Sequence, residues 1–282
     1  MSGAVAALLA DGRLHLQHGP IDLIIGADGD RQAAFAAAAA RFKTVLEELV
    51  TELPLLRRAV GVRPKGRIAR RMHDAVRPHG GVFVTPMAAV AGAVAEDVLA
   101  AMVSAAPLSR AYVNNGGDIA LHLTGVARFC MAVAGLDNTR LGEIDIVAAD
   151  PVRGLATSGQ GGRSLSMGIA DTVTVLAGSA AAADVAATLI ANAVDLPGHP
   201  AIRRIPARKM DPDSDLGARL VVTHVGPLTG AEAAQALFNG EGLAQDMVQR
   251  GLIHAAALFL RGQSCLVGHG NLQPNRKIPQ HA

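Results

Sequence analysis

An aspartate and a threonine stand four residues apart in a run of small apolar residues, SAAAADVAATLIAN, from Ser179 to Asn192. We expect a helix capped by Ser179, on which the oxygen atoms of Asp184 and Thr188 share one face, one turn apart. A carboxylate and a hydroxyl are costly to bury among alanine, valine, leucine and isoleucine unless both have partners. Because Mg²⁺ prefers oxygen ligands, the spacing predicts a metal site at Asp184 and Thr188. The alternative is a helical pair bonded only to neighbouring backbone.

A glycine turn carries another carboxylate. The segment NNGGDIA, residues 114–120, places Asp118 directly after two glycines. Asp118 either contacts a ligand or stabilises the turn by accepting backbone N–H bonds, as aspartate commonly does. Asn114 and Asn115 are typical turn residues, and the amide of one of them could face the same site.

A third segment has the features of an anion-binding loop. Residues 158–166, SGQGGRSLS, surround Arg163 with glycines and hydroxyl side chains. Glycines let backbone N–H groups approach an anion, and arginine adds a planar two-pronged donor, so the loop suits a phosphate or a carboxylate. The loop has neither the Walker spacing nor GxGxxG, and an ordinary surface loop is the alternative.

Composition narrows the classes of protein. The chain has 282 residues, of which 50% are hydrophobic and 2% aromatic, so small aliphatic side chains must fill a large core. A net charge of +2 is too near neutrality to indicate general nucleic-acid binding. The two cysteines, Cys130 and Cys265, have no metal-ligand spacing, which favours buried thiols in a reducing compartment.

Apolar stretches of the chain do not predict export or a membrane span. Residues 4–10, AVAALLA, are short, and no basic residue precedes them. Residues 169–194 approach the length of a span, but Asp171 and Asp184 interrupt them and Gly178 divides a strand-like part from a helix-like part. We therefore expect core there, and a cytoplasmic protein without a membrane partner.

Two long helices are predicted in the first part of the chain. The first runs from an N-cap at Asp30 to Leu53, where Pro54 ends it. The second has Thr85 as its cap, a proline at the first helical position, and an end near Ala105. Its many small residues leave room for another element to press closely against it.

Strand signals fill most of the remainder. Short turns join many of them, which indicates antiparallel pairing, and the recurrence of strand pairs and long helices predicts an α+β fold with helices covering antiparallel sheets. A Pro- and Asp-rich stretch, residues 195–217, is predicted to be a long surface loop. The predicted strands lie within residues 13–26, 110–114, 117–123, 128–135, 143–148, 172–178, 219–226 and 253–268.

A basic stretch, residues 57–79, holds eight lysines and arginines but only one acid, Asp74. Part of it, GRIARRMHDAV, is predicted to form a short helix. Such a run is usually a solvated face, although it could supply one or two cations to an anionic ligand. It has no aromatic residue for base stacking, so single-stranded nucleic acid is not an expected partner.

Four segments resemble a family of uncharacterised proteins related to the ApbE-like FAD:protein FMN transferases. Their order and spacing agree along the chain, and the likeness to ApbE itself rests mainly on residues 87–121 and 156–192. The segments are VTPMAAVAGAVAEDVL (84–99), YVNNGGDIALHL (112–123), GLATSGQGGRSLSMGIADTVTVLAGSAAAADVAATLIANAV (154–194) and DPDSDLGARLVV (211–222).

The resemblance implies paired antiparallel sheets backed by helices, as in the tunnelling fold. Residues 1–282 would form a single domain, in which roughly 1–125 and 126–282 could be pseudo-duplicated halves. In ApbE-like enzymes, Mg²⁺ helps to transfer FMN from FAD to a Ser or Thr hydroxyl of a protein, and an Asp-x-x-x-Thr helix that holds the metal matches Asp184 and Thr188. The family's Gly-Gly-Asp and Thr-Ser-Gly turns match Gly116, Gly117 and Asp118, and Thr157, Ser158 and Gly159.

The chain departs from the ApbE pattern at two places. Where the family has Lys-Gly-Tyr, in the helix before its Gly-Gly-Asp turn, this chain has Gly92, Ala93 and Val94. Upstream of the metal helix, RSLSMGIADTVTV lacks the family's His and Asp-Pro-x-Thr-Gly, and Asp171 could replace the acidic function. These departures leave FAD recognition and FMN transfer open. The alignment favours Asp97 as a structural or a ligand-facing residue.

Together these residues predict a cleft for an anionic nucleotide-, flavin- or pterin-type ligand, with Mg²⁺ and FAD or a related nucleotide as expected cofactors. An enzyme of this kind would use Mg²⁺ to neutralise a phosphoanhydride and Asp171 or Asp118 as general base. The alternative is a non-catalytic ligand-binding protein that kept the scaffold. Small-residue helices and apolar strands favour a homodimer. The expected ligand-binding residues are Asn115, Gly116, Gly117, Asp118, Thr157, Ser158, Gly159, Arg163 and Ser164, and the expected metal ligands are Asp184 and Thr188.

Overall fold

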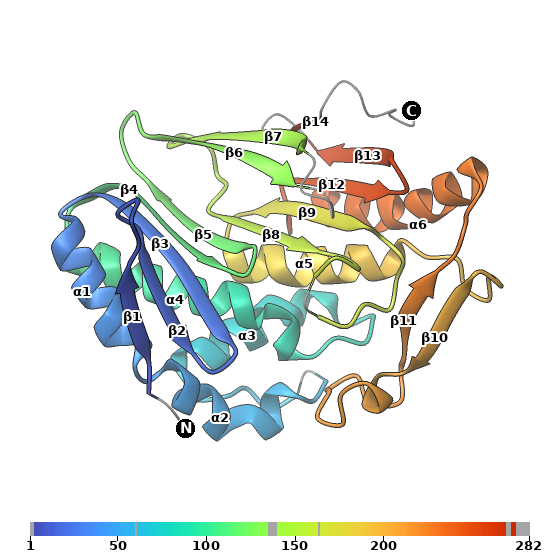
Figure 1. Cartoon of the computed structure of the whole chain (residues 1–282), viewed down its shortest axis with the longest axis horizontal. Coiled ribbons are helices and arrows are strands. Elements are labelled where there is room, and N and C mark those ends of the chain that lie inside the picture. Colours follow the sequence, from blue (N-terminus) through green and yellow to red (C-terminus); the bar gives the residue numbers. More distant parts are fainter. Residues whose placement is uncertain (1–2, 60, 135–139, 163, 269–271, 275–282) are drawn as a thin grey trace. The chain divides into compact units, whose positions relative to one another are not determined.

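The computed structural model describes residues 3–59, 61–134, 140–162, 164–268 and 272–274 (Figure 1). The chain divides into two compact units, and each is described by itself. Unit 1 consists of Met1–Arg128, Ile146–Ala156 and Ala177–Val185, and unit 2 of Phe129–Asp145, Thr157–Leu176 and Ala186–Ala282. The division runs through five elements, which are β6 (Arg128–Ala134), β7 (Arg140–Val147), β8 (Gly154–Ser158), β9 (Thr172–Ala177) and α5 (Ala180–Ala193).

Unit 1 is built on an antiparallel sheet. Its strands follow the order β1-β2-β3-β4-β5-β8, and each pairs antiparallel with the next. Buried and less buried residues alternate along β3, as expected for a sheet with one covered face. The strands that begin and end in this unit are β1 (Val5–Leu8), β2 (Leu14–His18), β3 (Ile21–Gly29), β4 (Leu108–Asn115) and β5 (Asp118–Leu123).

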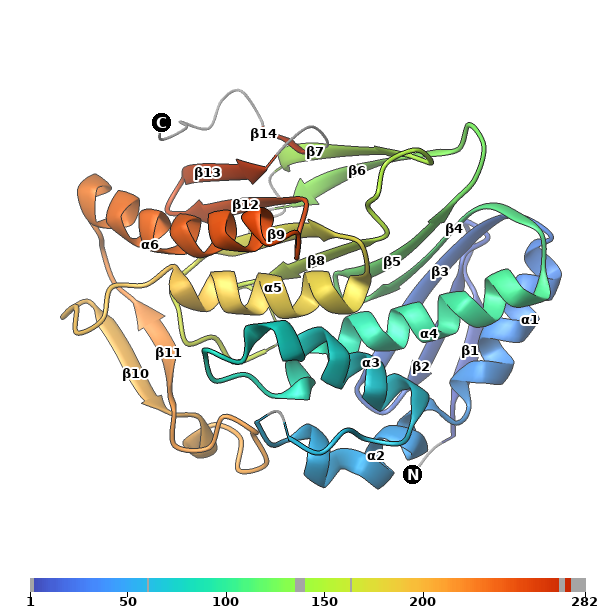
Figure 2. The ribbon, with the colours of Figure 1, turned by 180° about the vertical axis from the view of Figure 1, so that it is seen from behind.

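Helix α4 lies at the centre of unit 1. It packs on β4 and β5 and against α1 and α3, and Figure 2 shows α1 and α4 across one face of the sheet. Among the described residues, Pro86–Ala105 is the one helical segment long and apolar enough to cross a membrane, and it is 50% buried, as a core helix is. The helices are α1 (Arg31–Phe42), α2 (Val45–Leu56), α3 (Arg67–Val76) and α4 (Val90–Ala105), with 3₁₀ turns at Arg77–His79 and Pro86–Ala89.

The predicted helix from Asp30 to Leu53 is wrong in its extent. Asp30 caps α1 as expected, because its side chain accepts an N–H of the first turn at 3.1 Å. The chain then breaks at Lys43 and Thr44, and a second helix, α2, begins and continues through Pro54. Proline keeps a helical φ and sacrifices only its own N–H bond, so the last turn of α2 closes around it. The other predicted helix is confirmed, with its first turn in 3₁₀ form.

Unit 2 also contains antiparallel strand pairs. Strands β9, β12 and β13 pair in that order, and α6 packs on β12 and β13. Strand β14 pairs with β7, which lies next to β6, and β10 pairs with β11. The elements are β6 (Arg128–Ala134), β9 (Thr172–Ala177), β10 (Ile202–Pro206), β11 (Leu220–Val225), α6 (Gly230–Gln249), β12 (Ala255–Leu260), β13 (Gln263–Gly268), β14 (Leu272–Pro274) and a 3₁₀ turn, Ala207–Lys209.

The predicted α+β class, with antiparallel sheets covered by helices, is confirmed. The stretch expected to be core is core, since all six residues of β9 are buried. The expected surface loop at 195–217 is wrong, because β10 lies inside it and finds a partner, β11, beyond the Asp-rich turn. The prediction of buried cysteines holds for Cys265 but not for Cys130, which is exposed because it alternates along β6 with the buried Phe129.

Candidate functional site

The carboxylates of Asp118 and Asp184, both in unit 1, lie close enough to repel each other. Asp118 opens β5 directly after the glycine turn, and Asp184 lies in the second turn of α5. The turn requires glycine, because φ is +67° at Gly116 and +112° at Gly117. A side chain built at Gly117 would meet open space, so the turn leaves room beside its backbone.

The two asparagines of the turn are bonded to backbone. Asn114 Oδ1 accepts the N–H of Gly117 at 2.8 Å, which closes the turn. Asn115 is buried, and its Nδ2 donates to the carbonyl of Ala91 at 3.2 Å. Asn115 therefore ties the turn that carries Asp118 to the first turn of α4.

Asp184 faces the beginning of α4. Its Oδ2 accepts the N–H of Gly92 at 3.0 Å, and the backbone of Ala91 donates to the same carboxyl. The first N–H groups of a helix lack partners inside it and carry partial positive charge, so they favour a carboxylate. Burial, followed by the negative charge of Asp118, nevertheless raises the pKa of Asp184 well above its ordinary value of 3.8. No ion pair of Asp184 occurs among the described residues.

Helices α4 and α5 meet backbone to backbone beside Asp184. A Cβ added to Gly92 would lie 2.3 Å from the carbonyl oxygen of Ala180, so only glycine fits there. One turn later, Glu96 Oε1 accepts the N–H of Ala181 at 2.8 Å. Ser179 caps the same helix as predicted, since its Oγ accepts an N–H of the first turn at 3.2 Å. The close approach expected from the small residues of α4 is thus present.

The oxygen donors fit Mg²⁺ as part of a site that a ligand completes. Mg²⁺ is usually bound by one or two carboxylates together with waters and substrate phosphates. Asp118 and Asp184 supply two carboxylates, and a cation near both would offset the repulsion that raises the pKa of Asp184. No group of three or more His, Cys, Asp or Glu residues suited to a metal is found in the described part of the chain. Thr188 is half-buried on α5 and is counted with unit 2.

The predicted anion-binding loop belongs to unit 2. Thr157 and Thr174 share a hydrogen bond between their hydroxyl oxygens, 3.1 Å apart, across β8 and β9. Gly159 has φ of +136°, and a Cβ there would lie 2.7 Å from the carbonyl oxygen of Asp171, so glycine is required by a close approach. Ser158 is half-buried and Ser164 is exposed. Arg163 lies outside the described residues, so its predicted role stays a prediction.

Asp171 holds a turn of unit 2. Its Oδ2 accepts the backbone N–H of Arg261 at 2.6 Å, at the turn between β12 and β13. Arg261 has φ of +51°, a conformation that non-glycine residues adopt rarely, and the bond to Asp171 stabilises it. Burial raises the pKa of Asp171, and the Arg261 bond and charge act against this rise. A role of Asp171 as general base stays a prediction.

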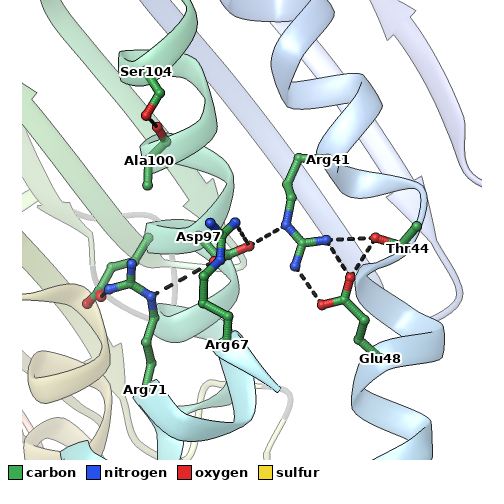
Figure 3. A network of polar contacts seen from close by, with 9 residues as sticks. Arg41, Thr44, Glu48, Arg67, Arg71, Asp97, Ala100 and Ser104 are labelled. Carbon is green, nitrogen blue, oxygen red and sulfur yellow. Dashed lines mark hydrogen bonds and ion pairs between the residues drawn. The ribbon is translucent and has the colours of Figure 1, made fainter. Parts of the chain in front are cut away.

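A buried charge cluster, consisting of Arg41, Glu48, Arg67, Arg71 and Asp97, was not predicted (Figure 3). Asp97 is 0% exposed; Arg41 Nε donates to its Oδ2 at 2.5 Å, and Arg67 Nε forms an ion pair with its Oδ1 at 2.6 Å. Arg71 Nε lies 4.0 Å from the same carboxylate, and Glu48 pairs with Arg41 at 2.7 Å. Asp97 is thus a structural residue. The sequence does contain one signal of this cluster. Arg67 and Arg71 stand four apart on α3, and Asp74 is the one acid in the stretch around them.

A separate hollow of about 220 Å³ lies in unit 1 near the start of α4. Leu55, Val62, His73 and Pro86 form part of its lining, and neither Asp118 nor Asp184 does. Its volume is below the roughly 300–1,000 Å³ that small-molecule pockets usually have, so we do not assign a ligand to it.

The distant likenesses among solved structures include ApbE proteins of two bacteria. The flavinyl transferase ApbE of Pseudomonas stutzeri, in its apo form, has a TM-score of 0.47 and 10% identity, covering 97% of this chain and 94% of that one. The ApbE protein of Thermotoga maritima has a TM-score of 0.46 and 10% identity, covering 97% of both chains.

Sequence comparison finds a nearly full-length family match. A family model described as AbpE bacteria matches residues 6–266. A UPF0280 protein of Methanopyrus kandleri is 36% identical over 176 residues, which are 61% of this chain and 69% of that protein. A UPF0280 protein of Methanococcoides burtonii is 38% identical over 119 residues, 42% of this chain and 49%, about half, of that protein. The chain therefore belongs to the family described as AbpE bacteria and to the UPF0280 proteins.

Proposed function

We propose that unit 1 binds a phosphate-bearing ligand of the nucleotide, flavin or pterin type, together with Mg²⁺ at Asp118 and Asp184. The observation that carries this proposal is the pair of neighbouring carboxylates, which repel each other beside a glycine turn with open space. Two half-buried carboxylates side by side without a cation are an unfavourable arrangement. A divalent cation that arrives with a phosphate ligand would make it favourable.

The residues of the chain have separate tasks in this proposal. The N–H of Gly92 orients the Asp184 carboxylate, and Asn115 fixes the turn that carries Asp118. The backbone of Gly117 leaves space for a phosphate group. When bound, Mg²⁺ supplies charge neutralisation of the phosphates and stabilises charge on a leaving oxygen. Asp118, which opens β5 beside that space, would accept the proton of an attacking hydroxyl or water.

The ApbE likeness of the sequence supports FAD as the first substrate to test. We would incubate the purified chain with FAD and Mg²⁺, follow release of FMN and AMP, and repeat the assay with Asp184→Ala and Asp118→Asn. Asp246→Asn is the matched control, because Asp246 is an exposed aspartate on α6 that pairs only locally with Arg250. Water is the acceptor in this assay, so release that both site variants lose and the control keeps supports cleavage of the FAD phosphoanhydride at this site. Absence of release by the wild type, or unchanged release by Asp184→Ala, rejects that chemistry.

A second candidate is a ligand-binding protein without catalysis. The position of the family's lysine is Gly92 here, and the backbone of α5 occupies the place of any side chain. Ala93 and Val94, which follow, are fully buried small residues. This candidate predicts protection against heat by FAD, FMN, pterins or nucleotides with Mg²⁺, but no turnover. A purely structural subunit would show no response to any of them.

We also propose a cytoplasmic homodimer. All four residues of β1 are exposed, and β2 is its one strand partner among the described strands. An open apolar strand edge can pair with the same strand of a second copy. The free cysteines, Cys130 and Cys265, are compatible with a reducing compartment. Sedimentation velocity of wild type and Ala6→Pro tests the dimer: a monomeric wild type rejects it, and a monomeric variant places the contact at β1.

A further inference from the structure

Glu96 connects three helices of unit 1 next to Asp184. Its Oε2 pairs with Arg71 Nη1 of α3 at 2.9 Å, and its Oε1 accepts the N–H of Ala181 at the start of α5 at 2.8 Å. One turn earlier on α4, the N–H of Gly92 donates to Asp184 at 3.0 Å. The two bonds run in opposite directions across the α4–α5 contact, so they fix α5 along α4 at two points.

We propose that Glu96 is a positioning residue that holds the Asp184 carboxylate beside Asp118; this inference rests on the proposed function of that pair. Repulsion between Asp118 and Asp184 favours movement of α5 away from the turn. The charge-assisted bond from Ala181 to Glu96 opposes this movement, and the positive end of α5 strengthens it. Glu96 therefore keeps together two carboxylates that would otherwise separate.

The charges around Glu96 indicate a structural support rather than an anion site. Glu96 is 14% exposed by its side chain, and the adjacent Asp97 is 0% exposed, so both are enclosed by the helices they join. Three arginines balance three acids in the combined network, which leaves no excess positive charge for a ligand. These residues are Arg41, Arg67 and Arg71, and Glu48, Glu96 and Asp97.

The test compares Glu96→Ala with Glu48→Ala in the full chain. Glu48 belongs to the same network through Arg41 but, among the described residues, has no hydrogen bond or ion pair with α5, so its variant controls for loss of network stability. The first measurement is hydrogen exchange of the amides of residues 91–92 in metal-free protein. The second is the Mg²⁺ dissociation constant by titration calorimetry, with urea unfolding as the measure of global stability.

Glu96→Ala should speed exchange of these amides and weaken Mg²⁺ binding, each by about tenfold, the size expected from one lost charge-assisted bond. Glu48→Ala should change neither beyond its effect on global unfolding. Glu96→Gln, which keeps an acceptor for Ala181, should restore most of both properties. If Glu96→Ala does not fold, Glu96→Asp, whose shorter side chain withdraws the acceptor from Ala181 while keeping the charge, is compared with Glu48→Asp by the same measurements.

Equal effects of the Glu96 and Glu48 variants would overturn the positioning role. So would a Glu96→Gln variant that behaves like Glu96→Ala, because the bond to Ala181 would then be irrelevant. A wild type that binds no Mg²⁺, yet shows faster exchange only in Glu96→Ala, would reject the proposed metal site and leave the positioning role of Glu96 intact. The two failures are therefore distinguishable.

Discussion

Helix α4 contacts two carboxylates with different surroundings. Asp97, on α4 itself, is buried and is enclosed by arginines of α1 and α3 at 2.5–2.6 Å. Asp184 is half-buried, accepts the backbone N–H groups of Ala91 and Gly92 in the first turn of α4, and has a second carboxylate, Asp118, nearby. The negative charge of Asp97 is thus balanced by arginines, whereas the negative charge of Asp184 faces that of Asp118.

This difference distinguishes a carboxylate that stabilises the fold from a pair of carboxylates that could bind a cation. A buried charge that is paired and hydrogen-bonded can be a permanent part of a fold, and its removal leaves its partners uncompensated. A buried charge beside another of the same sign costs stability in the absence of a cation, so it is retained more readily where a cation binds. The Asp97 cluster connects α1, α3 and α4, whereas Asp184 and Asp118 are the residues of the proposed site.

The largest expected effect comes from Asp97→Asn. Loss of the charge leaves the Arg41 guanidinium, with its side chain 14% exposed, short of one acid, so we expect the free energy of unfolding to fall by about 3 kcal/mol or more. Equilibrium unfolding in urea measures this change. Asp246→Asn, which removes an exposed pair, should cost at most about 0.5 kcal/mol. A similar small loss for Asp97→Asn would contradict the structural assignment.

The second-largest expected effect is stabilisation of the protein by Mg²⁺ bound at Asp118 and Asp184. A ligand at one hundred times its dissociation constant stabilises a protein by about 2.7 kcal/mol, and we expect wild type to gain this amount from Mg²⁺ with a bound nucleotide. Asp184→Asn should lose the gain, because one of the two carboxylates is gone. Unfolding with and without Mg²⁺ measures the difference. A full gain retained by Asp184→Asn would show that the cation binds elsewhere.

A third effect tests the backbone contact that places Asp184. The Cβ of Gly92→Ala would meet Ala180 at 2.3 Å, so α4 and α5 must separate, at a cost of about 1–3 kcal/mol. Gly242→Ala on α6 is the matched control: its Cβ meets nothing within 4 Å, and better helix propensity should stabilise the protein by up to about 1 kcal/mol. If both variants stabilise the protein, the close approach at Gly92 is not obligatory.

Local signals were sufficient for much of the fold. Asp30 and Ser179 were recognised as helix caps from residue type and position, and both make the expected bonds. The glycine turn before Asp118 was recognised in the same way, because only glycine adopts such φ values freely. The break between α1 and α2 was not, since Lys43 and Thr44 carry no strong breaker signal.

Local signals could not predict which residues far apart in the sequence would contact each other. The bond from Arg41 to Asp97 spans 56 residues, and the bond from Gly92 to Asp184 spans 92. The basic stretch therefore seemed to lack acids, although those of α4 pair with it. The proximity of Asp118 and Asp184 was expected from the family resemblance of two motifs, not from any spacing between them. Small residues on α4 did predict a close neighbour, but not that α5 would fill the position of a lysine.

The smallest expected effect is a change of stability with pH that comes from Asp184. The pKa of Asp184 is raised above 3.8 in the folded chain, so as pH rises the unfolded chain loses this proton first. The free energy of unfolding then falls until the folded carboxyl is ionised as well, by about 1.4 kcal/mol for each unit of pKa difference. The stability of wild type minus that of Asp184→Asn, measured in urea with EDTA at a series of pH values, isolates the contribution of Asp184. A difference that instead rises with pH would mean that the folded chain stabilises the ionised Asp184 carboxylate, and the repulsion from Asp118 would be refuted.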